Sequence, residues 1–232
     1  MNKTELNEIL KLHKLWLNGD PKGRCASLQD ANLSGANLSK VNLSDANLKY
    51  AILSDANLMG ADLSGADLSG ADLTGADLSG ADLSFVNLRN ANLSNADLSF
   101  VNLRGADLQD ADLRNADLSG AILTGADLRN AILSGATLSG AYLSFVNLRN
   151  ATFNKETVFP DGFDPVSCGM KLVEEKVPEA PSPTKQEEVV VVAAVPAAPK
   201  TLHEEIAEVL AKHGFDLVSL SIQPSKSRAN EG

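Results

Sequence analysis

Residues that could do chemistry are few and scattered in this sequence of 232 residues. The three histidines are His13, His203 and His213. His203-Glu204 fails the pattern of zinc proteases, because Ala207 stands where the second zinc-binding histidine must be. The many serines lie among aspartates, and no neighbouring base is available to activate their hydroxyl groups. We therefore predict that the chain is not an enzyme and has no catalytic residue, no metal site and no cofactor.

The charge of the chain limits the partners that it is expected to bind, and its cysteines indicate its compartment. Acidic residues outnumber basic ones by 30 to 20, so a nucleic-acid surface of clustered Lys and Arg is not expected. Cys25 and Cys168 bracket a long repeat array, too far apart for a disulfide, and predict free thiols in a reducing cytosol. Charged residues interrupt the first twenty positions, and the longest apolar run, 189–195, is too short to span a bilayer. We expect a cytoplasmic protein without membrane contact.

A five-residue repeat fills the middle of the chain. Steps of five from Ala26 give 26 consecutive pentads that end at Lys155. The third position is Leu from Leu28 to Leu148 and then Phe153, and the first position is always Ala or Val. The other three positions are mostly Asn, Asp, Ser, Thr, Arg or Gly, which predicts that they face water. A period of five fits neither a helix nor a plain strand, so each pentad predicts a short extended segment followed by a tight turn.

These pentads, for example Ala61-Asp62-Leu63-Ser64-Gly65, resemble the pentapeptide-repeat family with its A(D/N)LXX consensus. The resemblance covers residues 26 to about 160. It implies that four pentads make one square coil, with the first and third positions pointing inward, and that the coils form a right-handed quadrilateral β-helix. The predicted fold class is all-β: a pentapeptide-repeat solenoid over residues 26–155, with an N-terminal helical cap and a disordered C-terminal tail. About six and a half coils at about 4.8 Å each give a rod about 30 Å long.

Both ends of such a rod need covers, because an open solenoid exposes its core and its strand edge. Residues 1–25 predict a helical cap, with apolar positions at helical spacing from Glu5 to Asn18 and Gly19 as a helix stop. His13 is expected to pack within this cap. Residues 156–170 predict a C-terminal cap, where the repeat decays into apolar and turn-forming residues: Val158, Phe159, Pro160, Phe163 and Pro165.

The remaining residues predict a tether and a docking segment. Residues 171–200 carry Pro, Glu, Lys and Val without periodicity, which is typical of a disordered linker. Residues 201–222 combine a capping box and an amphipathic helix with a strand-like alternation, and residues 223–232 predict a disordered tail. We interpret 201–222 as a protein-docking element whose candidate binding residues are Ile206, Val209, Leu210 and Phe215.

Aspartates form the first candidate surface. A twenty-residue coil stacks Asp62 over Asp82, Asp77 over Asp97 and Asp117, and Asp107 over Asp127. This pattern is compatible with a solvated face, a cation site, or a mimic of the DNA backbone such as the quinolone-protecting members of the family. The pentads carry 14 Asp against eight Lys and Arg, a net charge of −6, whereas duplex DNA of the same length carries about 18 charges. The Gly-rich calcium repeat is also absent. We favour the solvated face.

Aromatic and basic columns are the remaining candidates. Phe85, Phe100 and Phe145 stand at the normally exposed fifth position of nearly identical segments. Phe85 and Phe145 are predicted three coils apart and Phe100 on another face, so local duplication is favoured over a contiguous binding patch. One column is basic and is expected to balance the charge of the aspartates; its members are Lys49, Arg89, Arg129 and Arg149.

The sequence as a whole predicts a non-enzymatic scaffold. Its rod presents an acidic surface and positions the docking element for a protein partner, in the manner implied by the resemblance to family members abundant in cyanobacteria. No nucleic acid or membrane is expected as a partner, and the chain is predicted to be a monomer or an end-to-end dimer. The alternative is a DNA-mimicking protein that acts on DNA gyrase or another topoisomerase. A redox or accessory role for Cys25 or Cys168 is supported by the two thiols alone.

Overall fold

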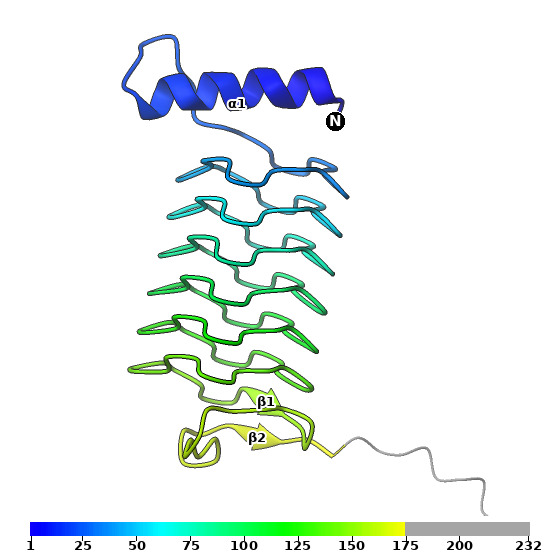
Figure 1. The fold of residues 1–232 in the computed structure, drawn as a ribbon, viewed down its shortest axis with the longest axis vertical. Coiled ribbons are helices and arrows are strands. Elements are labelled where there is room, and N and C mark those ends of the chain that lie inside the picture. Colours follow the sequence, from blue (N-terminus) through cyan, green and yellow to red (C-terminus); the bar gives the residue numbers. More distant parts are fainter. Residues whose placement is uncertain (175–232) are drawn as a thin grey trace, which may run out of the picture. The chain divides into compact units, whose positions relative to one another are not determined.

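The structure is a computed structural model that describes residues 1–174. Helix α1 (Lys3–Leu17) lies across one end of a stack of coils, and the short strands β1 (Thr152–Phe153) and β2 (Lys171–Leu172) lie at the other end (Figure 1). None of the helical structure in this part of the chain has the length and apolar character needed to cross a bilayer.

The coils repeat every twenty residues, as the resemblance implies. Asn42 forms a parallel bridge with Asp62, and Asp62 forms the next bridge with Asp82. Twenty residues are four pentads, so each coil has four sides. Within residues 1–174, continuous strands are limited to β1 and β2, which pair in parallel, because every other extended segment contributes one bridging residue. The predicted quadrilateral coil is therefore present, with little regular strand.

The four sides of the rod are numbered by the pentads that begin them. The pentads that begin at Ala26, Ala31, Ala36 and Val41 start the first, second, third and fourth sides of the first coil, and every later pentad falls on one of these sides in turn. The first side is opposite the third, and the second is opposite the fourth.

Each pentad is folded by hydrogen bonds that its own residue types supply. The Asp77 carboxylate accepts hydrogen bonds from the backbone N–H of Ser79 at 3.0 Å and from the Ser79 hydroxyl at 2.6 Å. The Ala81 N–H donates to the Leu78 carbonyl at 3.0 Å and closes the turn. Gly80 lies inside this turn with φ of 63°, a region that favours Gly and tolerates Asn and Asp. This is why the second position prefers Asn or Asp and the fifth prefers Gly or Asn.

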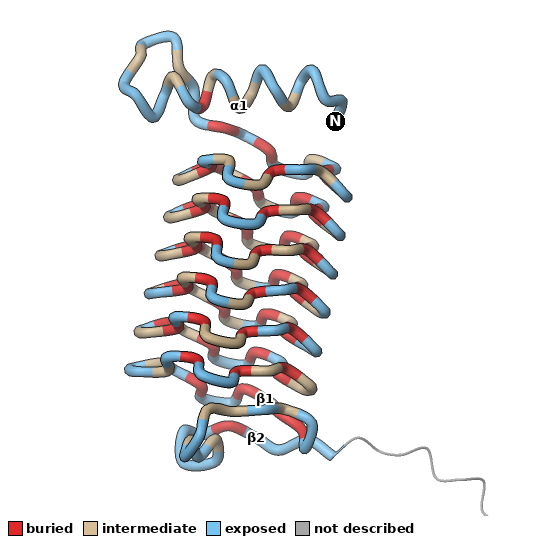
Figure 2. Tube along the Cα trace, viewed as in Figure 1, coloured by how far each residue is buried: buried red, intermediate tan, exposed pale blue. Residues whose placement is uncertain are grey.

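The core is one continuous column of Leu and Ala along the rod. Every third-position residue is buried except Leu143 (Figure 2). Hydrogen bonds lock neighbouring coils together: the Leu98 N–H donates to the Asp117 carbonyl at 2.7 Å, and the Asp97 N–H donates to the Ala76 carbonyl at 2.9 Å. Stacking thus satisfies the backbone and buries the side chains at the same time, as expected for a solenoid.

Helix α1 covers the N-terminal end of this core. It starts two residues before the predicted Glu5, because Asn2 is its N-cap: the Asn2 side chain accepts from the Glu5 N–H at 2.9 Å, and the Glu5 side chain accepts from the Asn2 N–H at 3.0 Å. Three apolar residues of α1 pack against the core: Leu6, Ile9 and Leu10.

His13 joins α1 to the first coil. Its ring is fully buried and stacks on Trp16, with the ring centroids 5.5 Å apart. The Ala26 N–H donates to His13 Nδ1 at 3.0 Å. Burial lowers the pKa of His13, so the ring is neutral at pH 7. The prediction that His13 is a packed cap residue is confirmed.

The C-terminal cap differs in extent from the prediction. Phe159 packs edge-on against Phe153, with the ring centroids 5.4 Å apart, and Val158 bridges Thr137. Structure continues beyond residue 170, because β2 pairs with β1 and the Val173 N–H donates to the Phe153 carbonyl at 2.7 Å. The expectation that the linker begins at Lys171 is therefore wrong. The rest of that linker, from 175, and the predicted segments 201–222 and 223–232 lie outside the described residues.

We predict that Leu98→Ala lowers the free energy of unfolding by about 2–5 kcal/mol, because it leaves a cavity in a fully buried column. Denaturant unfolding followed by circular dichroism measures the change. Arg104→Ala is the control; it alters an exposed side chain on the fourth side and should change the stability by no more than about 0.5 kcal/mol. A cost for Leu98→Ala no larger than that of the control would contradict the continuous core.

Candidate interaction surface

The predicted columns of stacked aspartates are present, but several of their carboxylates already accept hydrogen bonds from neighbouring side chains. Asp62 bridges Asp82, and Asp107 bridges Asp127. Neighbouring amides occupy several of the carboxylates: Asn42 Nδ2 donates to Asp62 at 2.9 Å, and Asn102 Nδ2 donates to Asp82 at 3.0 Å. Within residues 1–174 no group of three or more His, Cys, Asp or Glu side chains is placed to hold a metal ion.

The basic column of the first side neutralises further aspartates. Lys49 Nζ lies 3.1 Å from Asp67, and Arg89 lies 3.4 Å from Asp107. Arg129 makes a two-pronged contact with Asp127, with Nε at 3.0 Å from Oδ1 and Nη2 at 2.8 Å from Oδ2. The prediction that this column balances the aspartates is confirmed for these three residues.

Local hydrogen bonds set the ionisation of Asp127. Burial on its own would raise the pKa of this carboxyl, but hydrogen bonds from the Arg129 side chain and backbone outweigh that effect and hold the pKa below its usual range. The Asp127 carboxylate is therefore paired with Arg129. A column arranged in this way behaves as a balanced, solvated face.

The three phenylalanines lie on or beside the fourth side. Phe85 and Phe145 end pentads of this side, and Phe100 ends a third-side pentad at the corner where the fourth side begins. All three have positive φ, from 56° to 58°. The Phe85 ring lies over Gly105, where an added Cβ would come within 2.8 Å of it. Tyr50 and Phe100 lie over Gly70 and Gly120 in the same way, so each of these three aromatic residues has a Gly one coil later.

Two further residues complete an apolar surface that the sequence reasoning missed. Ile122 and Tyr142 stand at second positions of the fourth side, where Asn or Asp usually forms the local turn, and they bridge each other directly. Tyr142 is 63% exposed and Ile122 is 40% exposed. The three phenylalanines alone are not contiguous, as predicted, but these two residues lie between the Phe100 corner and the Phe145 corner. The sequence contained one signal for Ile122 and Tyr142: neither Asn nor Asp stands at the second position of their pentads.

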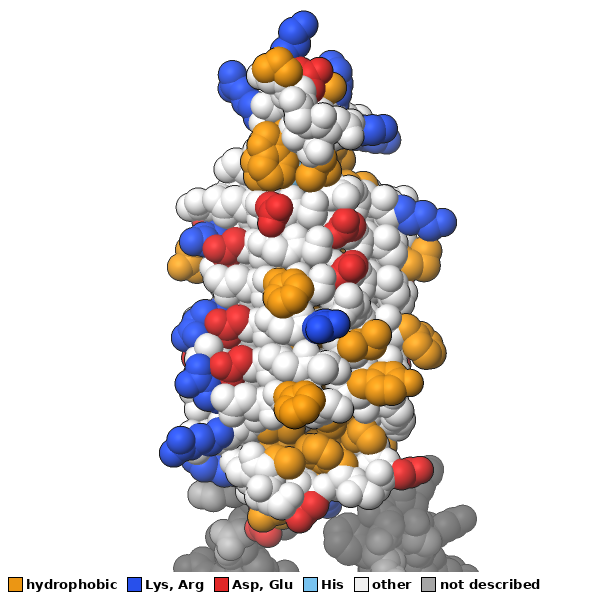
Figure 3. Space-filling model, turned by 90° about the vertical axis from the view of Figure 1, so that its left-hand side faces the viewer, with side chains coloured by type: hydrophobic (Ala, Val, Ile, Leu, Met, Phe, Trp, Pro, Cys, Tyr) orange, Lys and Arg blue, Asp and Glu red, His pale blue; other side chains and the backbone are white. Residues whose placement is uncertain are grey.

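We call this set the apolar face; its members are Phe85, Phe100, Ile122, Tyr142 and Phe145. Hydrophobic side chains gather on the lower part of the fourth side, whereas the upper part is largely polar and carries acidic groups (Figure 3). Tyr50, Ile52 and Met59 are other exposed apolar residues, but they stand on different columns.

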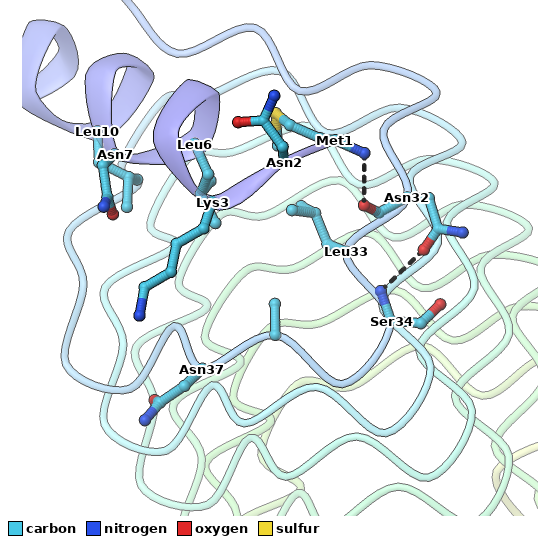
Figure 4. Close-up of a pocket in the computed structure, with 11 residues that line it drawn as sticks. Met1, Asn2, Lys3, Leu6, Asn7, Leu10, Asn32, Leu33, Ser34 and Asn37 are labelled. Carbon is cyan, nitrogen blue, oxygen red and sulfur yellow. Dashed lines mark hydrogen bonds between the residues drawn. The ribbon is translucent and has the colours of Figure 1, made fainter.

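The N-terminal end offers a shallow groove between α1 and the first coil (Figure 4). It has a volume of about 460 Å³. The Met1 amino group donates to the Asn32 carbonyl at 3.4 Å, and the Ser34 N–H donates to Asn32 Oδ1 at 3.1 Å. A straight helix cannot cover a square coil completely, which accounts for the groove. The residues that line the groove include no acidic side chain beside a basic one, so the groove offers no acid–base pair.

The two cysteines and the predicted docking residues give little support for a further functional site. Cys25 and Cys168 are exposed and free. Burial, followed by the nearby Asp45 carboxylate, raises the pKa of Cys25, which makes its thiol less reactive and does not favour the redox hypothesis. The predicted docking residues Ile206, Val209, Leu210 and Phe215 lie outside the described residues, so their role stays a prediction.

Comparison with known proteins settles the family. The model of the pentapeptide repeats matches in overlapping stretches that together run from residue 26 to residue 155. The chain belongs to the pentapeptide-repeat family. Pentapeptide-repeat proteins of known structure are similar to this chain, whereas no curated protein matches it.

The similar structures include proteins from cyanobacteria. HetL of Nostoc sp. strain PCC 7120, described as involved in the regulation of heterocyst differentiation, is 36% identical over 64% of this chain and 69% of its own, with a TM-score of 0.49. Rfr23 of Cyanothece 51142 is 32% identical over 64% of this chain and 96% of its own, with a TM-score of 0.39. A trypsin-treated variant of QnrB1, a plasmid-mediated fluoroquinolone resistance protein, is 24% identical over 62% of this chain and 78% of its own, with a TM-score of 0.33.

We predict that Arg129→Ala raises the pKa of Asp127. The lowered pKa contributes stability above the ordinary carboxyl pKa of about 3.9, and that contribution is lost as pH falls through the folded-state pKa. Carboxyl chemical shifts in an NMR titration report the midpoint. Arg104→Ala, which removes an arginine with no ion pair within residues 1–174, should leave the Asp127 midpoint unchanged. An unchanged midpoint in Arg129→Ala would show that the pair does not form in solution.

Proposed function

We propose that this pentapeptide-repeat protein is a non-enzymatic scaffold that binds a protein partner through its apolar face. The observation that carries the proposal is the set of five exposed apolar side chains on or beside the fourth side of a rod whose other outward positions are mostly polar. Exposed aromatic residues are enriched in protein–protein interfaces, where they supply large contact area at a small entropic cost. The coil holds them on a rigid backbone, so little ordering is required on binding.

The members of the apolar face add little to the stability of the rod. Phe100 and Phe145 occupy left-handed conformations that Gly, Asn or Asp would adopt with less strain. Tyr142 cannot accept the local backbone hydrogen bond that Asp77 accepts in its own pentad. Their side chains point away from the core. Residues that break the local rules of a fold without supporting its core are expected at functional sites.

The docking segment predicted from the sequence belongs to the same proposal as a second contact. A helix that carries Ile206, Val209 and Leu210 on a long tether would bind the same partner from a second point. Two linked contacts raise the overall affinity through their effective concentration, without any change in either contact.

We predict that the double variant Phe100→Asp/Tyr142→Asp loses the partner in an affinity capture from host lysate, because two charges are introduced into the apolar face. The matched control is Tyr50→Asp, which changes an exposed aromatic residue on the first side and should retain the partner. Recovery of the same proteins by the wild type and the double variant would refute the rod as the binding surface. The variant Ile206→Asp/Leu210→Asp tests the tail contact separately.

The alternative function is mimicry of DNA at gyrase or another topoisomerase. The stacked aspartates favour it, but the ion pairs with Lys49, Arg89 and Arg129 reduce the available negative charge. We predict that the purified full chain does not inhibit supercoiling by gyrase. Inhibition that disappears at high salt, and that charge reversal at Asp77 and Asp97 abolishes, would support the mimic and overturn this prediction.

A further inference from the structure

One arginine stands within the apolar face. Arg104 is exposed and occupies the fourth position of the fourth-side pentad 101–105, in a column that otherwise carries Ser or Thr. It is the only basic residue among the pentads of this side. Figure 3 shows a basic group among the hydrophobic side chains on the lower part of the fourth side. The apolar face therefore contains a single positive charge.

Two phenylalanine rings frame the position of this arginine. The Phe85 ring lies over Gly105, the residue that directly follows Arg104. The Phe100 ring lies over the glycine one coil later in the same way, at the opposite edge of the fourth side. Ile122 stands one coil later and two positions back along the side, which places its Cα about 8 Å from that of Arg104. The guanidinium is thus attached at the centre of the apolar residues.

Arg104 has no ion pair within residues 1–174, unlike most arginines of the rod. Arg89, Arg114 and Arg129 each pair with an aspartate. For Arg114 and Arg129 this aspartate stands two residues earlier in the same pentad. The residue two positions before Arg104 is Asn102, which carries no charge.

The sequence also lacks the carboxylates that a second type of pairing would use. Arg89 lies in the same local segment, Val-Asn-Leu-Arg, and contacts the aspartates 18 and 21 residues later, Asp107 at 3.4 Å and Asp110 at 3.8 Å. The residues at the same two distances after Arg104 are Ile122 and Gly125. An apolar residue and a glycine therefore stand where the coil places the acidic partners of Arg89.

The nearest carboxylate of the fourth side has other partners. Asp82, one coil earlier, accepts hydrogen bonds from Asn102 Nδ2 at 3.0 Å and from the Ser84 N–H at 2.9 Å. In the opposite direction along the rod, the fourth-side pentads 121–125 and 141–145 contain no acidic residue. The Arg104 guanidinium is thus available to a group that a partner supplies.

A partner that covers the apolar face must also satisfy this charge. Covering the aromatic residues removes water from the guanidinium between them, and a buried charge without a counter-charge is strongly unfavourable. The planar guanidinium matches a carboxylate, which can accept two parallel hydrogen bonds from it. Arginine and tyrosine are also among the residues that most often dominate the energy of an interface.

We propose that the partner presents an acidic side chain, Asp or Glu, flanked by apolar residues, and that its carboxylate pairs with Arg104. This inference rests on the proposed function and defines the chemistry of the segment that the apolar face binds. A phosphorylated segment is less well suited, because a phosphate carries nearly two negative charges. The fourth side offers one cation, and the Asp82 carboxylate lies one coil away from it.

Selection of random peptides displayed on phage, with the full chain immobilised, tests this chemistry without knowledge of the natural partner. Peptides retained by the wild type and released by Phe100→Asp/Tyr142→Asp are the ones that bind the apolar face. We expect these peptides to carry Asp or Glu beside aromatic or aliphatic residues. The enrichment of the acidic residue should be lost when the selection is repeated on Arg104→Glu.

A charge exchange then tests the pair itself. A synthetic peptide from the selection should bind Arg104→Glu at least about tenfold more weakly than the wild type in isothermal titration calorimetry. Replacement of its acidic residue by Lys should restore most of the binding to Arg104→Glu, which also shows that this variant is folded. Lys40→Glu is the matched control. It reverses an exposed charge three coils before Phe100 in the same column and should change the affinity by less than about twofold.

The outcomes separate this inference from the proposed function. Peptides that require the apolar face but show no preference for Asp or Glu would overturn the inference and leave the proposed function standing. Equal affinity of the acidic peptide for the wild type and Arg104→Glu would do the same. Peptides retained equally by Phe100→Asp/Tyr142→Asp, or no enrichment on the wild type, would instead overturn the proposed function and this inference with it.

Discussion

The hydrogen bond from one coil to the next is the interaction on which the rest of this structure depends. It is formed when a Leu N–H donates to the carbonyl of the residue nineteen positions later, as Leu98 does to Asp117. The same stacking step buries the Leu side chain, so backbone pairing and core formation cannot be separated. A coil at the end of the stack loses both, which is why α1 and the cap around Phe159 matter more than any single pentad.

Much of this architecture could be predicted from the sequence, because its determinants are local. Leu at the third position, Asn or Asp at the second and Gly or Asn at the fifth each correspond to one bond or one dihedral angle, as in the pentad 76–80. The end of the cap could not be predicted, because Lys171 and Leu172 carry no repeat signal and are ordered by the partner strand β1. The path of the cap across the last coil could not be predicted either, because it is a tertiary property.

The candidate surface was partly visible in the sequence. Phe85, Phe100 and Phe145 were conspicuous because aromatic residues are rare here, whereas Ile122 and Tyr142 were missed because their only signal is a departure from Asn or Asp in one column. The columns of the coil bring these residues onto or beside the fourth side, although they are spread over sixty positions of sequence. Two classes of outward residue result: the balanced ion pairs of the first side, which keep the rod solvated, and the apolar face, which can gain contact area from a partner.

The strict coil period gives residue number a geometric meaning. Phe85 and Phe145 are sixty residues apart, so they share an edge at different heights, whereas Phe100, fifteen residues after Phe85, falls on the adjacent edge. Gain or loss of one pentad would rotate everything beyond it by a quarter turn, and gain of a whole coil would shift it along the axis by about 4.8 Å without rotation. Length changes in multiples of twenty are therefore the ones that preserve the alignment of surface residues at the two ends of the rod.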